Sequence, residues 1–327
     1  MESIEVPRTM RAVVARGRGG NEVVALEERA VPRPGRGELL VRVRAAAVNP
    51  RDWMIRSGRY PLQFTLPRSG LVLGSDLAGE VVATGPGRGR FAVGERVHAM
   101  QPGRRFGAFA DYARVPEAVA ARVPDGLGDA EAAAMTLAGL TAWQGLVDEG
   151  GVGKGGRVLV IGAAGGVGHM AVQLARALGA RVTGVCSGAG ASFVLGLGAD
   201  RVLDRASPWT AGAGRDWDAV FDAFGAFGFG AARRLLAGRG VYVGTWPTPR
   251  IIAATLATRL WPPGRQCRLV AVRSDGEDLA ALGALAAAGR LRVEVARTFP
   301  LEAVAEALDA SRGFRTRGKL VIAIAPA

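Results

Sequence analysis

The sequence predicts an α/β protein in which a doubly wound parallel sheet is inserted into a β-rich domain. Three observations predict this class. About the first 125 residues hold short alternating runs separated by glycine and proline turns. From about residue 129, strand-like runs alternate with helical segments. The chain has 327 residues, more than one hydrophobic core usually organises, so we expect two domains.

The elements follow in order along the chain. Short strands are expected over residues 11–15 and 39–43, where apolar residues recur with a short period. From residue 129, an alanine-rich helical segment leads to an apolar strand over residues 158–161, a glycine turn and a helix over residues 169–178. Further strands are expected over residues 182–185, 219–221, 241–243 and 269–272. This alternation of strands and helices predicts a parallel, doubly wound sheet.

The last part of the chain shows two helical patterns, over residues 276–288 and 301–312, and a final strand over residues 320–324. We expect this tail to rejoin the first domain. The predicted division is residues 1–125 with 266–327 for the β-rich domain, and residues 126–265 for the parallel-sheet domain.

Charge and composition limit the classes of partner. The net charge is +13, but Lys154 and Lys319 are the only lysines, and the other 40 of the 42 basic residues are arginines spread along the chain. This spread disfavours nucleic acid as a partner, and no apolar run reaches the length of a membrane span. The N-terminal residues do not resemble a secretory signal, which favours a cytoplasmic location.

The cysteines and histidines offer little chemistry of their own. Cys186 and Cys267 lie far apart and outside any cluster of metal-binding residues, so we expect two buried thiols. His98 falls in a strand-like run, and His169 is expected to face away from the start of the helix after the glycine turn. Neither histidine is a strong catalytic candidate.

A glycine-rich turn between a predicted strand and a predicted helix has the context of a dinucleotide-binding fingerprint. In such a turn the first small residue permits the tight bend, the second lets the backbone approach the pyrophosphate, and the third lets helix and strand pack closely. Ala163, Gly165 and Gly168 take these three places, and the helix N-terminus supplies amide donors. The whole turn consists of Ala163, Ala164, Gly165, Gly166, Val167 and Gly168.

The residue after the second strand of this unit bears on the choice of cofactor. An NAD enzyme needs an acidic residue there for the ribose 2′-hydroxyl, but this chain has Ser187 and no carboxylate between Arg181 and Ala199. A 2′-phosphate would meet no repulsion from this stretch, which favours NADPH. A relaxed choice between the two nucleotides is the alternative.

Several further segments carry a family resemblance. They are residues 48–52 (Val-Asn-Pro-Arg-Asp), 57–61 (Ser-Gly-Arg-Tyr-Pro), 73–82, 138–143 (Ala-Gly-Leu-Thr-Ala-Trp), 197–200 (Leu-Gly-Ala-Asp) and 318–322 (Gly-Lys-Leu-Val-Ile). With the glycine turn, they make the chain resemble the quinone oxidoreductase branch of the medium-chain dehydrogenase/reductases, which includes zinc-free enoyl-thioester reductases. The resemblance covers nearly the whole chain. It implies a GroES-like catalytic domain, an inserted Rossmann domain, an active site in the cleft and a homodimer.

The resemblance also implies roles for particular residues. It places Asn49 and Thr141 near the nicotinamide ribose, and the backbone around Gly244, Val270 and Val272 along the nicotinamide ring. Lys319 is expected among the cofactor-binding residues. Where relatives carry a tyrosine beside the 2′-phosphate, this chain has Arg205, a suitable partner for phosphate unless it is a plain surface arginine. Asn49 also precedes Pro50, so forming the turn there is an equal interpretation of its role.

Zinc-dependent relatives carry a cysteine near Asn49, a His-Glu pair at Ser75 and Asp76, a further ligand near Ala138 and a four-cysteine lobe. This chain has none of these ligands, and no cysteine precedes Cys186. We therefore expect no bound metal and polarisation of the substrate by hydrogen bonds instead.

Tyr60 is the best single candidate for a proton or hydrogen-bond donor. It corresponds to a tyrosine with which enoyl-thioester reductases of this branch bind or protonate their substrate. Hydride addition to an enone or enoyl thioester leaves an enolate, which needs such a donor. The alternative is a tyrosine that lines or packs the cleft, and related quinone reductases share it.

The function predicted from these features is NADPH-dependent reduction of an activated carbon-carbon double bond without zinc. NADPH:quinone oxidoreductase is the alternative within the enzyme class, and a non-catalytic nucleotide- or RNA-binding member of the family is the alternative from another class. The substrate is expected to be a small molecule, either free or bound to CoA or to a carrier protein. Arginines that would receive such a carrier are Arg56, Arg59, Arg104 and Arg105, with solvated surface charge as the alternative.

Overall fold

The chain divides into two compact units. The computed structural model describes residues 5–60, 64, 66–87, 89–103, 105–262 and 264–325. The first unit comprises Met1–Leu137, Arg273–Ala287 and Val295–Ala327, and the second comprises Ala138–Val272 and Ala288–Glu294. Against the division expected from the sequence, residues 126–137 fall in the first unit, and residues 266–272 and 288–294 fall in the second.

A seven-stranded sheet forms the main layer of the first unit. Its order is β15-β16-β3-β5-β6-β8, and β7 also pairs with β3. Along β3, Val41 and Val43 are buried while Arg42 lies between them on the other face, as the period of a strand requires. Arg42 faces Glu80 of β5 in register, with a nitrogen-oxygen distance of 2.7 Å. The strands are β3 (Glu38–Val48), β5 (Asp76–Thr84), β6 (Arg96–Met100), β7 (Tyr112–Pro116), β8 (Ala120–Arg122), β15 (Val295–Pro300) and β16 (Lys319–Ala323).

The C-terminal tail returns to this sheet, as the sequence predicts. β16 pairs antiparallel with β3, so that Leu320 lies opposite Val48, and β15 pairs parallel with β16. A smaller antiparallel sheet contains β1 (Thr9–Ala15), β2 (Val24–Ala30) and β4 (Leu71–Val72). Helices and short turns of the unit are η1 (Asn21–Val23), α1 (Pro50–Arg56), η3 (Glu117–Val119), α8 (Gly276–Ala287), η6 (Leu301–Ala303) and α9 (Val304–Arg312).

The second unit contains a parallel six-stranded sheet in the order β11-β10-β9-β12-β13-β14. Counted along the chain, this is the strand order 3-2-1-4-5-6 of doubly wound dinucleotide-binding domains. Every strand pair in it is parallel. The strands are β9 (Arg157–Ile161), β10 (Arg181–Cys186), β11 (Arg201–Asp204), β12 (Trp217–Asp222), β13 (Leu236–Gly244) and β14 (Gln266–Leu269).

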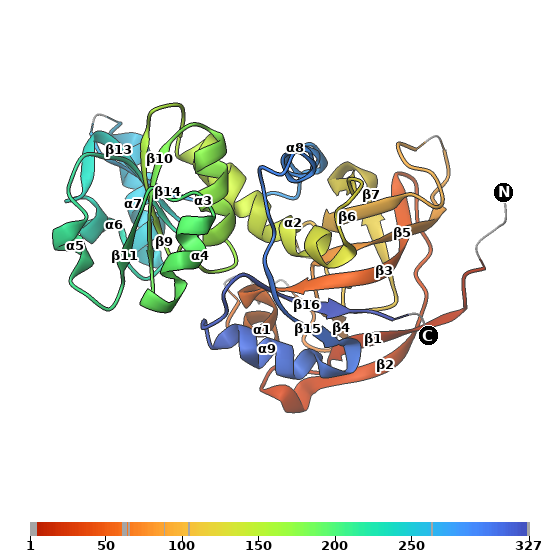
Figure 1. The fold of residues 1–327 in the computed structure, drawn as a ribbon. Coiled ribbons are helices and arrows are strands. Elements are labelled where there is room, and N and C mark those ends of the chain that lie inside the picture. Colours follow the sequence, from red (N-terminus) through yellow and green to blue (C-terminus); the bar gives the residue numbers. More distant parts are fainter. Residues whose placement is uncertain are drawn as a thin grey trace. The chain divides into compact units, whose positions relative to one another are not determined.

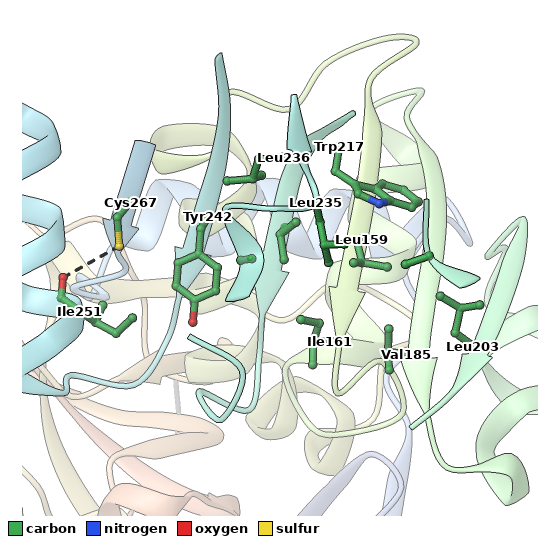
Figure 2. Packing of buried hydrophobic residues seen from close by; sticks show 13 residues of the cluster. Leu159, Ile161, Val185, Leu203, Trp217, Leu235, Leu236, Tyr242, Ile251 and Cys267 are labelled. Atoms are coloured by element: carbon green, nitrogen blue, oxygen red, sulfur yellow. Dashed lines mark hydrogen bonds between the residues drawn. The ribbon is translucent and has the colours of Figure 1, made fainter. Parts of the chain in front are cut away.

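Helices cover both faces of this parallel sheet, with α3 and α4 together on one face (Figure 1). On the other face, Leu159, Val220 and Tyr242 pack with side chains of α6 and α7 in one buried cluster. Figure 2 shows this cluster, with the ring of Tyr242 between Cys267 and Leu236. The remaining elements are α2 (Asp129–Gln144), η4 (Gly145–Glu149), α3 (Gly168–Ala177), η5 (Gly188–Gly190), α4 (Ala191–Gly196), α5 (Trp209–Gly212), α6 (Phe229–Ala232) and α7 (Pro249–Leu260).

Both cysteines are buried free thiols, as expected. Burial raises the pKa of the Cys186 thiol, and the nearby Asp204 charge acts in the same direction. Among the residues that the structure describes, no helix is both long and apolar enough to cross a membrane.

Candidate functional site

The glycine turn joins β9 to α3 at the carboxyl end of the parallel sheet. A Cβ on Gly168 would lie 2.0 Å from the carbonyl oxygen of Gly162, so only glycine lets the helix approach the strand so closely. A Cβ on Gly165 would meet only that same oxygen, at 3.3 Å, which leaves the space in front of Gly165 open. The first turn of α3 carries no acidic residue, so the amide end of this helix is free to attract phosphate.

The sharp bend of this turn is made by Gly162, so the expectation that Ala163 makes it is wrong. Gly162 has a φ of +79°, in the left-handed region that favours glycine. Ala163 packs toward β10 instead, where its Cβ would lie 2.9 Å from a Cβ on Gly184. The sequence signal for the bend was the glycine directly after the apolar strand.

An acid and an arginine lie beside the position expected for the 2′-phosphate. Ser187 follows β10 and is half-buried, and the backbone N–H of Arg205 donates to the Cys186 carbonyl at 2.7 Å. Asp204 ends the neighbouring strand β11, and a Cβ on Gly188 would lie 3.2 Å from its Oδ2 atom. Asp204 and Arg205 are both exposed. The residues after β10 give no sign of Asp204 in the sequence, because the parallel neighbour β11 carries this acid.

The residues expected along the nicotinamide ring lie together at the end of β13 and β14. The backbone N–H of Val270 donates to the carbonyl of Gly244 at 3.0 Å, and Val272 follows half-buried. A Cβ on Gly145 would lie 3.0 Å from Val270. Thr141 of α2 is buried and precedes Gly145, the first residue of η4, by about one helical turn, so the two lie on the same side of this continuous helical segment.

In the first unit, a fully buried polar cluster surrounds Asn49. Asn49 is the N-cap of α1 and is 1% exposed, and its backbone N–H donates to Asp52 Oδ2 at 2.8 Å. Its side-chain Nδ2 donates to Asp76 Oδ2 at 2.8 Å, and its Oδ1 accepts from Lys319 Nζ. Lys319 Nζ also donates to the carbonyl of Val48 at 3.0 Å. The cluster therefore ties α1, β5 and β16 together, and Asn49 forms the turn before the helix as the second interpretation expected.

Burial has the largest effect on the pKa values of the charged groups in this cluster. It raises the pKa of Asp76 and lowers the pKa of Lys319, while each of these two charges opposes the shift of the other. Burial also raises the pKa of Asp52 to about 7. Asp76 receives a further hydrogen bond from Ser75 Oγ at 3.2 Å and from the backbone N–H of Leu137 at 3.3 Å. A charge here is tolerated because partners surround it.

Tyr60 lies beyond the opposite end of α1 from Asn49, so the seven-residue helix separates them. Tyr60 is half-buried, and the guanidinium carbon of Arg51 lies 6.0 Å from the centre of its ring. The same guanidinium lies 5.0 Å from the ring centre of Phe106. Arg51 thus links the segment containing Tyr60 to the loop containing Phe106.

Of the four arginines expected to receive a carrier, the three that the structure describes differ in exposure and in partners. Arg56 is 2% exposed and bonds with Asn21 and Asp309, so it is not available to a ligand in solution. Arg105 pairs with Glu38 at 2.7 Å. Arg59 is exposed, whereas Arg104 and the motif residue Pro61 lie outside the described residues.

The two histidines are buried structural residues. Burial lowers the pKa of His98 to about 4. The sequence suggested that His169 faces outward, but in the structure it is fully buried. Its Nδ1 lies 2.9 Å from the carbonyl of Gly165, and its Nε2 accepts from the backbone N–H of Glu294 at 3.2 Å. It joins the glycine turn to residues 288–294, a segment that Gln173 holds through two bonds with the Arg292 backbone.

Zinc-dependent relatives bind zinc at positions where this chain has side chains that make other contacts. Asn49 and Asp76 bond to each other, Ser75 donates to Asp76, and Ala138 offers no donor atom. Within the described ranges, no group of three histidine, cysteine, aspartate or glutamate side chains is placed to hold a metal ion.

Comparison with known families matches two models to the chain. One is described as an alcohol dehydrogenase GroES-like domain and matches residues 35–125, and the other as a zinc-binding dehydrogenase and matches residues 197–322. A chloroplast envelope quinone oxidoreductase homolog of Arabidopsis thaliana is 32% identical over 89% of this chain and 91% of its own length. A phthioceranic/hydroxyphthioceranic acid synthase of Mycobacterium bovis is 34% identical over 89% of this chain, which spans only 14% of that synthase.

Solved structures of similar proteins superpose closely on this chain. A quinone oxidoreductase from Coxiella burnetii is 27% identical and superposes with a TM-score of 0.87, over 97% of this chain and all of that one. A mycobacterial protein complexed with NADPH is 31% identical, with a TM-score of 0.80 over 96% and 99% of the two chains. A protein described as an NAD-dependent alcohol dehydrogenase is 32% identical, with a TM-score of 0.83 over 97% and 100%.

The chain belongs to the medium-chain dehydrogenase/reductase family, among the quinone oxidoreductase homologues. It is an oxidoreductase by family, with a GroES-like domain and a Rossmann domain as the sequence predicts. The open glycine turn and the amide end of α3 fit a nicotinamide nucleotide as its cofactor class.

Proposed function

We propose that this protein is an NADPH-dependent reductase that adds hydride to an activated carbon-carbon double bond, in an enone or an enoyl thioester, without zinc. The observation that carries this proposal is the turn from Gly162 to Gly168, open in front of Gly165, at the carboxyl end of the parallel sheet. NADPH supplies the hydride when it is bound. The residues of the chain bind and orient the reactants and supply a proton.

Asn49 and Lys319 are proposed to act by holding one wall of the site in place. Both polar atoms of the Asn49 side chain are engaged, and Lys319 is 5% exposed. Such fully bonded side chains keep their geometry as reactants enter, which preorganises the groups next to them. Thr141 and the backbone of Gly244, Val270 and Val272 are the proposed neighbours of the nicotinamide end.

Tyr60 is the proposed donor to the substrate. When hydride has added to the β-carbon, negative charge develops on the carbonyl oxygen, and the α-carbon needs a proton. The phenol of Tyr60 is able to hydrogen bond to that oxygen or to protonate that carbon. Arg51 lies over its ring and helps to fix its orientation.

Replacement of Tyr60 by phenylalanine tests this role. We expect Tyr60→Phe to lower kcat about a hundredfold or more on the best substrate of a panel containing an enone, an enoyl thioester and a quinone, because a positioned proton donor contributes on this scale. The measurement is the rate of NADPH oxidation. Tyr112→Phe, a tyrosine on β7 of the same unit, is the matched control. An unchanged kcat for Tyr60→Phe would exclude the donor role.

Quinone reduction is the second candidate function. It is favoured by the names of the relative from Arabidopsis thaliana and of the structure from Coxiella burnetii. The match to a segment of an acid synthase favours the first candidate. The substrate class that is reduced faster in the panel decides between these two functions. A chain that oxidises NADPH with no member of the panel would instead support a non-catalytic, nucleotide- or RNA-binding function.

The preference for NADPH is proposed to rest on Arg205, opposed by Asp204. Arg205→Ala is expected to raise the KM for NADPH about tenfold and to leave the KM for NADH within about twofold, since a charged hydrogen bond to the 2′-phosphate is lost. Asp204→Asn is expected to lower the KM for NADPH. Arg181→Ala is the control, because this exposed arginine begins β10 at the other end of the sheet. Equal changes for both nucleotides would rule out contact with the 2′-phosphate.

A homodimer is part of the proposal. Exposed apolar side chains recur at every fourth position along α7, which packs against the edge strand β14. They are Ile252, Leu256 and Leu260, and Trp261 follows. A stripe of this kind beside an open sheet edge favours association with a second copy. Light scattering from the purified chain measures the assembly directly.

We also propose a cytoplasmic location and a small-molecule substrate, free or carried on CoA or a carrier protein.

A further inference from the structure

Segment 288–294 joins two elements of the first unit, α8 and β15, but itself belongs to the second unit. Leu291 and Val293 are buried while Arg292 between them is exposed, as in an extended chain. Gln173 of α3 is 7% exposed and binds the segment as a neighbouring strand would. Its Oε1 accepts from the backbone N–H of Arg292 at 2.7 Å, and its Nε2 donates to the Arg292 carbonyl at 2.8 Å. The segment is therefore held against α3, the helix that follows the glycine turn.

His169, the second residue of α3, connects this segment to the glycine turn. The side chain is fully buried. Its Nδ1 atom lies 2.9 Å from the carbonyl oxygen of Gly165, and its Nε2 atom lies 3.2 Å from the backbone nitrogen of Glu294. Since a carbonyl only accepts and a backbone N–H only donates, these partners assign a neutral ring with its hydrogen on Nδ1. The histidine therefore donates to the turn with one nitrogen and accepts from the segment with the other.

The carbonyl of Gly165 is fixed by two donors from one residue, because the backbone N–H of His169 also donates to it, at 3.0 Å. In a trans peptide the carbonyl and the following N–H point in opposite directions, so a fixed Gly165 carbonyl also fixes the N–H of Gly166. Gly166 is half-buried, and its N–H has no hydrogen-bond acceptor among the residues that the structure describes. This N–H is preset to donate to an oxygen of a ligand.

We propose that His169 is a positioning residue of the nucleotide site. Through the Gly165 carbonyl it orients the Gly166 N–H toward the pyrophosphate of the cofactor, and segment 288–294 keeps the imidazole in the tautomer that this requires. The inference rests on the proposed function and adds a support for the turn from a distant part of the chain. A donor that is already oriented loses little freedom when the phosphate binds. NADPH and NADH share the pyrophosphate, so His169 should affect both nucleotides equally, in contrast to Arg205.

Asparagine and glutamine at this position each keep one of the two contacts of the histidine. The amide nitrogen of asparagine takes the place of Nδ1, so His169→Asn still donates to the Gly165 carbonyl. The amide oxygen of glutamine takes the place of Nε2, so His169→Gln still accepts from the Glu294 N–H but loses the bond to the turn. In calorimetric titrations with NADPH and with NADH, we expect His169→Gln to raise both Kd values about tenfold, since one hydrogen bond that orients the turn is lost. His169→Asn should stay within about threefold of wild type.

Two further measurements check the contacts themselves. Hydrogen exchange at the Glu294 amide should stay slow in His169→Gln and become faster in His169→Asn, and near-ultraviolet circular dichroism checks that both variants are folded. Nitrogen-15 NMR of wild type depends on no folded variant, and it should show His169 with hydrogen on Nδ1 and none on Nε2. The chain has only two histidines, so the signal that is absent from His169→Gln identifies His169.

Equal Kd values for His169→Asn and His169→Gln, or a change confined to one of the two nucleotides, would overturn the inference and leave the proposed function standing. A hydrogen on Nε2 of His169 in wild type would overturn it as well, because that tautomer has no donor for the Gly165 carbonyl. Wild type that binds neither nucleotide would overturn the proposed function, and this inference with it.

Discussion

Gly168→Ala is expected to weaken nucleotide binding at least a hundredfold and to lower the Tm by several degrees. The new Cβ would lie 2.0 Å from the carbonyl oxygen of Gly162, 2.7 Å from its carbonyl carbon and 2.9 Å from the Cα of Ala163. All three atoms belong to the backbone, so no side chain is able to move aside. Overpacking of this kind costs about 1–3 kcal/mol or more, and α3 must shift away from the turn that it completes. Calorimetric titration with NADPH and thermal unfolding measure the two effects.

Two other glycines separate the effect on the fold from the effect on binding. Gly165→Ala adds a Cβ whose one close neighbour is 3.3 Å away, so it should keep the Tm of wild type but bind NADPH about tenfold more weakly. Gly196→Ala at the end of α4 meets nothing within 4 Å and should leave both values unchanged. If Gly168→Ala bound NADPH as wild type does, the close approach of α3 would not be needed for binding.

Lys319→Met is expected to lower the free energy of unfolding by about 3–5 kcal/mol, measured by urea unfolding at pH 8. The change leaves the fully buried Asp76 without the cation whose charge acts on it most strongly. Removal of one partner from a buried ion pair costs this much because the other charge stays buried. Asn49 also loses the donor to its Oδ1 atom.

The double variant Lys319→Met/Asp76→Asn is the control, and it should recover much of the loss because the carboxylate on which the lysine acts most directly is then neutral. The loss of unfolding free energy caused by Lys319→Met should also be smaller at pH 5 than at pH 8. Burial already raises the pKa of Asp76 in the folded protein, and loss of the lysine raises it further. The folded variant then takes up a proton that the unfolded chain does not, so its stability increases as the pH falls. An equal deficit at both pH values would contradict an unpaired charge as the cause.

The central strands of the second unit could be predicted closely from the sequence. The strands expected over residues 158–161 and 182–185 are observed as Arg157–Ile161 and Arg181–Cys186. Such strands are buried on both faces, so they read as continuous apolar runs bounded by glycine. β11, Arg201–Asp204, was missed, because this edge strand is short and largely exposed. The position of residues 288–294 was also missed, since side-chain bonds from Gln173 and His169 hold this segment and leave no periodic pattern.

The candidate site was predictable where one continuous segment makes it. The strand, glycine turn and helix around Gly165 and Gly168 follow each other directly, so the spacing alone reveals them. Asp204 was not found, because it ends β11, the parallel neighbour of β10. Only the strand order brings this acid close to the residues that follow β10, and this order depends on long-range packing.

The division of the chain has a mechanical consequence. The first unit contains both the earliest strand, β1, and the last, β16, while the second unit is inserted between them. A stretching force applied to β1 and β16 is therefore carried by the GroES-like unit until that unit ruptures. The inserted unit is not in the path of such a load, so its glycine turn would stay undisturbed.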